Sequence, residues 1–179
     1  WNKVFIMATN LEFIKSASAS NVASLDITDC FSNEYETYKV VYDYVRAYDS
    51  SAYVRTRLLD STNTVIDASE YDYAELAMRS YNTFFENRGT NNTHFSIGYS
   101  YDYNTGGGEM TIFNPYNSSS YTFVNNHNAG GTILNGDLFG YKGISVHKSA
   151  EQINGLRIYV TGGGSFDINE ITIKVYGVK

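Results

Sequence analysis

The sequence is poor in cysteine and in basic residues. Its single cysteine, Cys30, excludes both an internal disulfide and a cysteine-ligated zinc site. The 13 lysines and arginines are scattered, and the net charge is −6. Because a nucleic-acid-binding surface needs a basic stripe, we expect no nucleic-acid partner. No apolar run approaches the roughly 20 residues of a membrane helix, so we expect no membrane insertion. Residues 1–30 also lack a signal-peptide pattern.

Proline is nearly absent, whereas tyrosine and glycine are abundant. Pro115 is the only proline, against 17 tyrosines and 15 glycines. Many tyrosines together with Asn, Ser and Thr are typical of strands and turns rather than helices. Hydrophobic residues make up 42% of the 179 residues, enough for a core. We therefore expect one domain spanning residues 1–179.

The clearest strand pattern lies at residues 153–160 and 170–179, which a glycine-rich link joins. In both segments apolar residues alternate, so each presents one apolar face. The apolar positions are Leu156, Ile158 and Val160 in one segment and Ile171, Ile173 and Val175 in the other. Two such strands need a second layer to bury their apolar sides, so the chain is expected to end inside a sheet.

Short strands recur along the rest of the chain. They are predicted at residues 1–8, 22–27, 37–48, 52–60, 94–103, 109–113, 121–125 and 141–147. Strands 37–48 and 52–60 are expected to form a hairpin, and the Ser/Ala-rich residues 15–24 an arm or connection. Residues 71–82 favour a strand or irregular loop, and any short helix would lie there. The spacing indicates an antiparallel β-sandwich or barrel.

Several sequence blocks occur in the order found in a family of bacteriophage virion proteins. The blocks are Leu25-Asp26-Ile27, residues 35–41, 53–60 and 110–115, Ile153-Asn154-Gly155-Leu156-Arg157 and Val175-Tyr176-Gly177-Val178. The chain resembles this jelly-roll family of tail-fibre, tail and capsid-appendage proteins of marine and cyanobacterial phages. It departs from the pattern at Phe31-Ser32-Asn33-Glu34, where many relatives carry a proline. The resemblance implies a structural or adhesive role with no catalytic residues.

No catalytic or metal-binding motif is evident. His94, His127 and His147 lie on separate predicted elements without metal-ligand spacing, and no Gly-x-Ser-x-Gly motif occurs. We therefore predict no catalytic residue, no metal ligand and no cofactor. The acids Asp67, Glu70, Asp72 and Glu75 are dense enough to pair, as in a polysaccharide depolymerase, or to bind calcium. A solvated loop is the preferred interpretation of this acidic group.

Tyrosines supply the candidate binding residues. Tyr99, Tyr101 and Tyr103 are two residues apart and share one strand face, while Tyr116 and Tyr121 flank an Asn/Ser-rich loop. Such rings can stack on sugars, pack within the fold or form a protein contact. At the other end of the chain, the segment 1–24 carries Trp1 and Phe5. We expect this segment to be an arm that docks to a partner.

The sequence thus predicts an all-β, single antiparallel β-sandwich of jelly-roll type with at most one short helix. The expected function is that of a non-enzymatic virion structural protein in a tail, tail fibre or capsid appendage, assembled in the bacterial host cytoplasm. Its expected partners are other virion proteins and copies of itself, with a homotrimer by analogy, and a host-surface glycan as a further partner. The alternatives are a carbohydrate-binding module and, third, a polysaccharide depolymerase.

Overall fold

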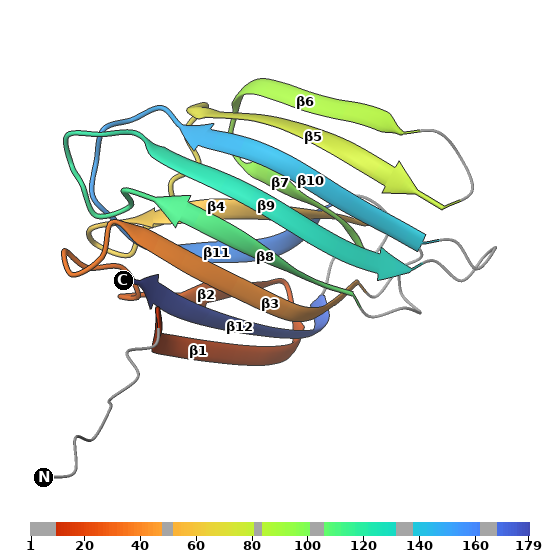
Figure 1. Ribbon diagram of the computed structural model, residues 1–179, viewed down its shortest axis with the longest axis horizontal. Coiled ribbons are helices and arrows are strands. Elements are labelled where there is room, and N and C mark those ends of the chain that lie inside the picture. The colour runs from red at the N-terminus through yellow and green to blue at the C-terminus, as the bar shows by residue number, and fades with distance from the viewer. Residues whose placement is uncertain (1–9, 48–51, 81–83, 101–105, 132–137, 162–167) are drawn as a thin grey trace, which may run out of the picture.

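The structure is a computed structural model that describes residues 10–47, 52–80, 84–100, 106–131, 138–161 and 168–179 (Figure 1). These residues form twelve strands and no helix, so the all-β prediction is confirmed. The strands are β1 (Leu11–Val22), β2 (Ser24–Ile27), β3 (Thr37–Ala47), β4 (Ala52–Asp60), β5 (Tyr71–Arg79), β6 (Phe85–Asn92), β7 (Phe95–Ser100), β8 (Gly107–Phe113), β9 (Thr122–Gly131), β10 (Leu138–His147), β11 (Ile153–Thr161) and β12 (Ile168–Val178). A helix with the length and apolar character needed to cross a bilayer is not found in the described ranges.

The strands form two antiparallel sheets that pack face to face. The larger sheet has the order β1-β12-β3-β8-β9-β10-β5-β6, and the smaller has the order β2-β11-β4-β7. Figure 1 shows the smaller sheet behind the larger one. Each sheet needs the other because its apolar face would otherwise be exposed to water.

The strands of the two sheets pair in a nested order, in which the first strand pairs with the last and the second with the last but one. β1 pairs with β12, β2 with β11, β3 with β8, and β4 with β7. Successive pairs alternate between the larger and the smaller sheet. A long antiparallel hairpin rolled into two sheets in this way is a jelly roll. The predicted jelly-roll sandwich is therefore confirmed by the topology.

Two inserted hairpins enlarge one sheet beyond the eight jelly-roll strands. Strands β5 and β6 are inserted between β4 and β7, and β9 and β10 between β8 and β11. In space they continue the larger sheet past β8 in the order β9-β10-β5-β6, at the top of Figure 1. We call these four strands the extension. Strand β7, at the edge of the smaller sheet, lies against β5, β9 and β10.

The core lies between the two sheets and is largely aliphatic. The alternating apolar residues predicted for the last two strands are all in it, with exposed fractions of 0–4%. They are Leu156, Ile158 and Val160 of β11 and Ile171, Ile173 and Val175 of β12. A second, smaller cluster of Ala77, Phe139 and Tyr141 lies under the extension.

Two sequence predictions about individual segments were wrong. The Ser/Ala-rich stretch is part of β1, which pairs with β12 along its length, with Ala17 and Ala19 packed against the core. The expected hairpin does not form, because β3 pairs with β8 and β12 while β4 pairs with β7 and β11 in the other sheet. Residues 71–79 are strand β5, as favoured. The strand predicted at residues 1–8 lies outside the described residues.

Candidate functional site

The outer face of the enlarged sheet is the candidate site. This face points away from the smaller sheet and toward the viewer in Figure 1. Antiparallel register places alternate residues of β9, β10, β5 and β6 side by side on it. We call the following set the extension face: Phe123, Asn125, His127, Lys142, Ile144, Val146, Asp72, Ala74, Leu76, Glu86 and Arg88.

Large apolar side chains stand exposed near the middle of the extension face. Ile144 is 63% exposed, Phe123 47% and Leu76 43%. Ile144 lies directly between Asn125 of β9 and Ala74 of β5 in the ladder. The neighbours in sequence, such as Ser145 and Glu75, are buried on the inner side. A single exposed apolar residue is ordinary, but neighbouring ones on adjacent strands indicate a contact surface.

The extension face is hollowed rather than flat. A hollow of about 480 Å³ is lined by Phe123, Ile144 and Arg88 among others. A second, of about 410 Å³, lies beside Leu76, and a third, of about 370 Å³, beside His127. Ile144 borders all three. The apolar centre is therefore surrounded by shallow depressions into which side chains or a sugar ring could fit.

Charged side chains line the rim of this face. Arg88 and Lys142 form no ion pair with any residue in the described ranges. Other lysines do: Lys148 Nζ lies 2.8 Å from Asp72 Oδ1, and Lys39 Nζ lies 2.6 Å from Glu109 Oε2. An apolar centre with a charged rim is the usual composition of a protein interface.

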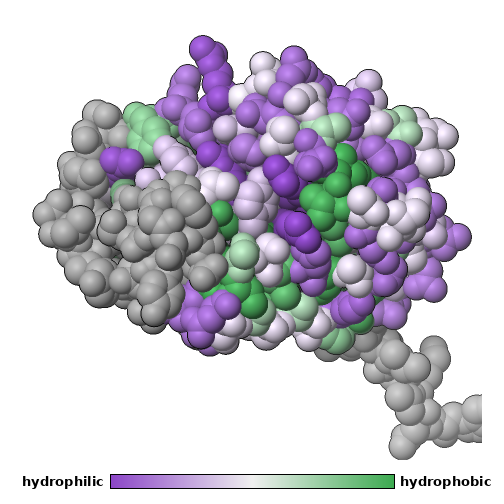
Figure 2. All heavy atoms as spheres, turned by 180° about the vertical axis from the view of Figure 1, so that it is seen from behind, coloured by the Kyte–Doolittle hydropathy of each residue, from purple (hydrophilic) through white to green (hydrophobic). Residues whose placement is uncertain are grey.

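The outer face of the smaller sheet differs because its arginines already have partners. Arg57 donates to Thr93 O at 2.8 Å, and Arg157 donates to both carboxylate oxygens of Asp26, at 2.6 and 2.8 Å. Figure 2 shows this side, where hydrophilic side chains cover much of the described surface between apolar patches. These groups stabilise the sheet itself, so we place the site on the extension face.

Among the five predicted tyrosines, Tyr121 is the one that the structure shows to be exposed. Its exposed fraction is 46%. Tyr99 is half-buried, with its ring 4.5 Å from that of Tyr53, and packs against the smaller apolar cluster. Tyr116 packs against the main core. Tyr101 and Tyr103, and the proposed arm residues Trp1 and Phe5, lie outside the described residues.

The residues of this face that were not predicted do have a sequence signal. Phe123, Asn125 and His127, together with the predicted Tyr121, alternate with buried Thr122, Val124 and Asn126. This pattern reverses the usual one, because aromatic and polar residues share the solvent side of β9. Considering which aromatic residues lie opposite the apolar positions would have identified this face.

The inner side of the extension contains a buried carboxyl group. Glu75 is 4% exposed, and its Oε2 accepts a hydrogen bond from Asn87 Nδ2 at 3.0 Å. Burial raises the pKa of Glu75, and hydrogen bonds from Ser96 and Asn87 and the charge of Arg55 oppose this shift. The pKa of Asp72 is lowered, first by its hydrogen bond from Lys148. Glu75 and Asp72 lie on opposite faces of β5, so they cannot flank one glycosidic bond as a depolymerase pair would.

The buried Glu75 predicts a pH-dependent cost to stability. Because the pKa of Glu75 is raised in the folded state, the contribution of this carboxyl to stability is complete at pH values below its unfolded-state pKa. That contribution is lost as the pH rises through its folded-state pKa. We expect Glu75→Gln to increase the free energy of unfolding at pH 7 by about 1 kcal/mol. The difference should vanish near pH 4, where Glu75 is protonated. Denaturant titrations at both pH values measure it.

The matched control for this prediction is Glu34→Gln, in the connection between β2 and β3 and outside the extension face. Glu34 is exposed, so its replacement should change stability little at either pH. A Glu75→Gln protein less stable than the wild type at pH 7 would contradict the prediction. It would mean that the ionised carboxylate gains more from Arg55 and its hydrogen bonds than it loses by burial.

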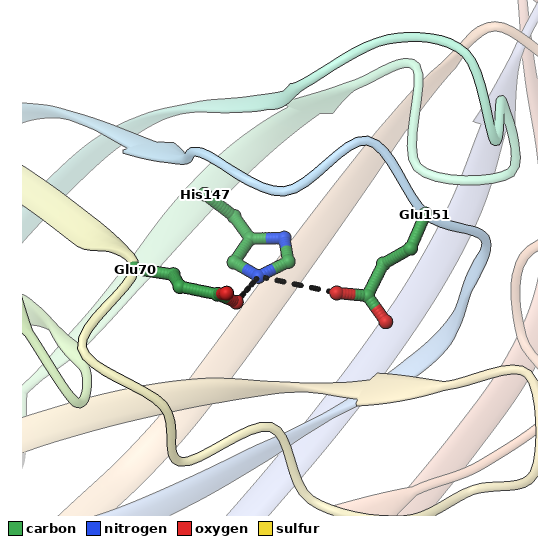
Figure 3. A group of neighbouring side chains, drawn as sticks. All are labelled: Glu70, His147 and Glu151. Carbon is green, nitrogen blue, oxygen red and sulfur yellow. Dashed lines mark hydrogen bonds and ion pairs between the residues drawn. The ribbon is translucent and has the colours of Figure 1, made fainter.

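A second group of titratable residues lies at the end of β10 (Figure 3). The side chain of His147 is fully buried, and its Nε2 atom points toward the carboxylates of Glu70 and Glu151. No local sequence pattern indicates this cluster, because Glu70 precedes His147 by 77 positions. The structure brings them together by pairing β5 with β10.

Comparisons with known proteins identify no family for this chain. No protein-family model matches the chain, and no curated protein matches it. Among solved structures it is similar to a marine PL-14 alginate lyase from Aplysia kurodai, with 6% sequence identity. The match covers 92% of this chain and 81% of the lyase chain, with a TM-score of 0.31. A similarity this weak carries no argument about function.

Proposed function

We propose that the chain is a non-enzymatic structural protein of a bacteriophage virion, in a tail, tail fibre or capsid appendage, that assembles with copies of itself through the extension face. The observation that carries the assembly role is the exposed apolar centre of Ile144, Phe123 and Leu76. The virion setting rests on the sequence resemblance and agrees with the jelly-roll topology.

A second copy of the chain is the occupant that the charges favour. The rim of the extension face carries both signs, Arg88 and Lys142 beside Glu86 and Asp72. When two copies of one face meet around a symmetry axis, each cation can approach an acid of the other copy. A rim of one sign would instead repel its own copy.

The experiment that tests the proposal is a mass measurement by light scattering behind size exclusion. We expect a stable oligomer whose mass falls toward that of the monomer when the apolar centre is made charged. A monomer at all accessible concentrations would contradict self-assembly through this face. An antibody against the chain that fails to label purified particles of the encoding phage would contradict the virion setting.

Carbohydrate binding is the second candidate, favoured by the aromatic pair Tyr121 and Phe123. These rings are 46% and 47% exposed, and Asn125 follows on the same side of β9. Stacking of a sugar on an aromatic ring, with an amide to bind its hydroxyls, is a usual mode of glycan recognition. Arg88 and Lys142, which form no ion pair among the described residues, would favour acidic sugars.

If the face binds glycans, a Phe123→Ala variant should lose most of the binding measured on an array of neutral and acidic glycans. Loss of one stacking ring should weaken affinity by about tenfold. Phe13→Ala is the matched control, because Phe13 is also exposed, at 57%, but lies on β1 at the opposite edge of the sheet. Equal binding by the two variants would exclude this face as the glycan site.

A further inference from the structure

The cluster at the end of β10 joins three segments of the chain. His147 is the last residue of β10, Glu70 immediately precedes β5, and Glu151 lies in the connection between β10 and β11. Figure 3 shows the two carboxylates on either side of the imidazole edge that carries Nε2. We propose that Glu70, His147 and Glu151 bind one divalent transition-metal cation of the Zn²⁺ type.

The distances among the ligand atoms suit such an ion. His147 Nε2 lies 3.2 Å from Glu70 Oε2 and 3.6 Å from Glu151 Oε1. In a tetrahedral zinc site with bonds of about 2.1 Å, neighbouring ligand atoms are about 3.4 Å apart. All three atoms lie within 4.8 Å of one another. The glutamates are 39% and 35% exposed, so they can move the remaining distance toward an ion.

The buried side of the imidazole supports the same assignment. His147 Nδ1 is buried and has no hydrogen-bond partner among the described residues, and the same is true of Thr122 Oγ1. Thr122 lies directly opposite His147 in the ladder between β9 and β10. A hydrogen bond from Nδ1–H to this hydroxyl, direct or through one water, would satisfy both atoms. Metal-binding histidines commonly orient their second nitrogen in this way.

With its hydrogen on Nδ1, the His147 imidazole adds a third acceptor atom to the cluster. If Nδ1 carries the hydrogen of the neutral ring, Nε2 presents a lone pair to two carboxylates. Three acceptors then converge, and they repel one another unless a positive charge lies between them. The charge is either a second proton on the imidazole or a metal ion. One imidazole and two carboxylates form a ligand set that binds Zn²⁺, and the exposed side leaves a fourth position for water.

A bound ion would join the extension to the jelly roll. Glu70 ends the connection from β4 to β5, and Lys148 N donates to Glu70 O at 2.8 Å beside it. The ring of Tyr71 lies 4.9 Å from that of His147 and is itself buried. The ion would therefore link two connections that already pack together. Its binding should stabilise the fold.

The test is calorimetric titration of ZnCl₂ into chelator-treated, full-length protein, together with thermal unfolding. We expect one zinc ion per chain. At zinc concentrations a hundredfold above the dissociation constant, the midpoint temperature should rise by about 5–10 °C. Glu70→Gln and Glu151→Gln should each weaken zinc binding by about tenfold or more. Both residues are partly exposed, so these variants test the site without opening the core.

His147→Gln and His94→Gln form a matched pair. Loss of His147 should abolish the one-to-one binding, whereas His94, a partly exposed histidine between β6 and β7 and outside the extension face, should be dispensable. Zinc binding that survives Glu70→Gln and Glu151→Gln unchanged would overturn the proposal, as would the absence of binding to the wild type. Neither result depends on whether the chain self-associates.

Discussion

We expect Ile144→Asp to dissociate the proposed assembly into monomers. Ile144 borders all three hollows of the extension face and is 63% exposed. In an assembled state it would lie at the apolar centre, where an aspartate would be buried without a partner. Affinity should fall by about a hundredfold or more, as for a central interface residue. Light scattering over a concentration series measures this loss.

The control is Leu11→Asp on β1. Leu11 is a 41% exposed leucine at the opposite edge of the same sheet. Both variants should retain the wild-type circular dichroism spectrum, because neither side chain is in the core. If Leu11→Asp dissociates the oligomer and Ile144→Asp does not, the contact lies at the β1 edge and the proposed surface is wrong.

Leu156→Ala should give the largest loss of stability among these substitutions. Leu156 has no exposed surface and lies between Leu58 of β4 and Ile27 of β2 in the smaller sheet, both also buried. Removing its buried methyl groups leaves a cavity that two packed sheets can only partly close. We expect a loss of about 3 kcal/mol in the free energy of unfolding. The midpoint temperature should fall by roughly 6–12 °C.

Leu138→Ala makes the same chemical change where little is buried. Leu138 is 66% exposed at the start of β10, so its truncation should change the free energy of unfolding by less than about 0.5 kcal/mol. Comparable losses in the two variants would indicate that the core is not concentrated between the jelly-roll sheets. Chemical denaturation, followed by tyrosine fluorescence, distinguishes these outcomes.

The sequence was informative where alternation was strong. Residues 52–60 and the strands around Leu156 and Ile173 were found because large apolar side chains alternate with polar ones. β1 was missed because its inward residues include Ala17 and Ala19, whose size differs little from that of the serines beside them. β6 was missed because it is a polar edge strand at the end of the extension.

Pairing and sites were harder to predict, because both depend on contacts far apart in sequence. A short turn between residues 47 and 52 suggested a hairpin, but the partners of β3 and β4 lie in the second half of the chain. The approach of Glu70 and Glu151 to His147 likewise follows from strand order, which no local spacing encodes. The predicted tyrosines were chosen by residue type and by their local spacing. Neither property shows which side of a strand is already covered.

The first-with-last pairing also determines when the protein can fold during synthesis. Of the twelve described strands β1 is synthesised first, yet its Leu11 pairs with Val178 of β12, the last of them. The β12 strand also separates β1 from β3, so the larger sheet cannot close until β12 has been made. Such high contact order predicts folding in milliseconds to seconds. Until β12 has been made, the nascent chain thus carries an unpaired β1 edge, and aggregation is the main competing reaction.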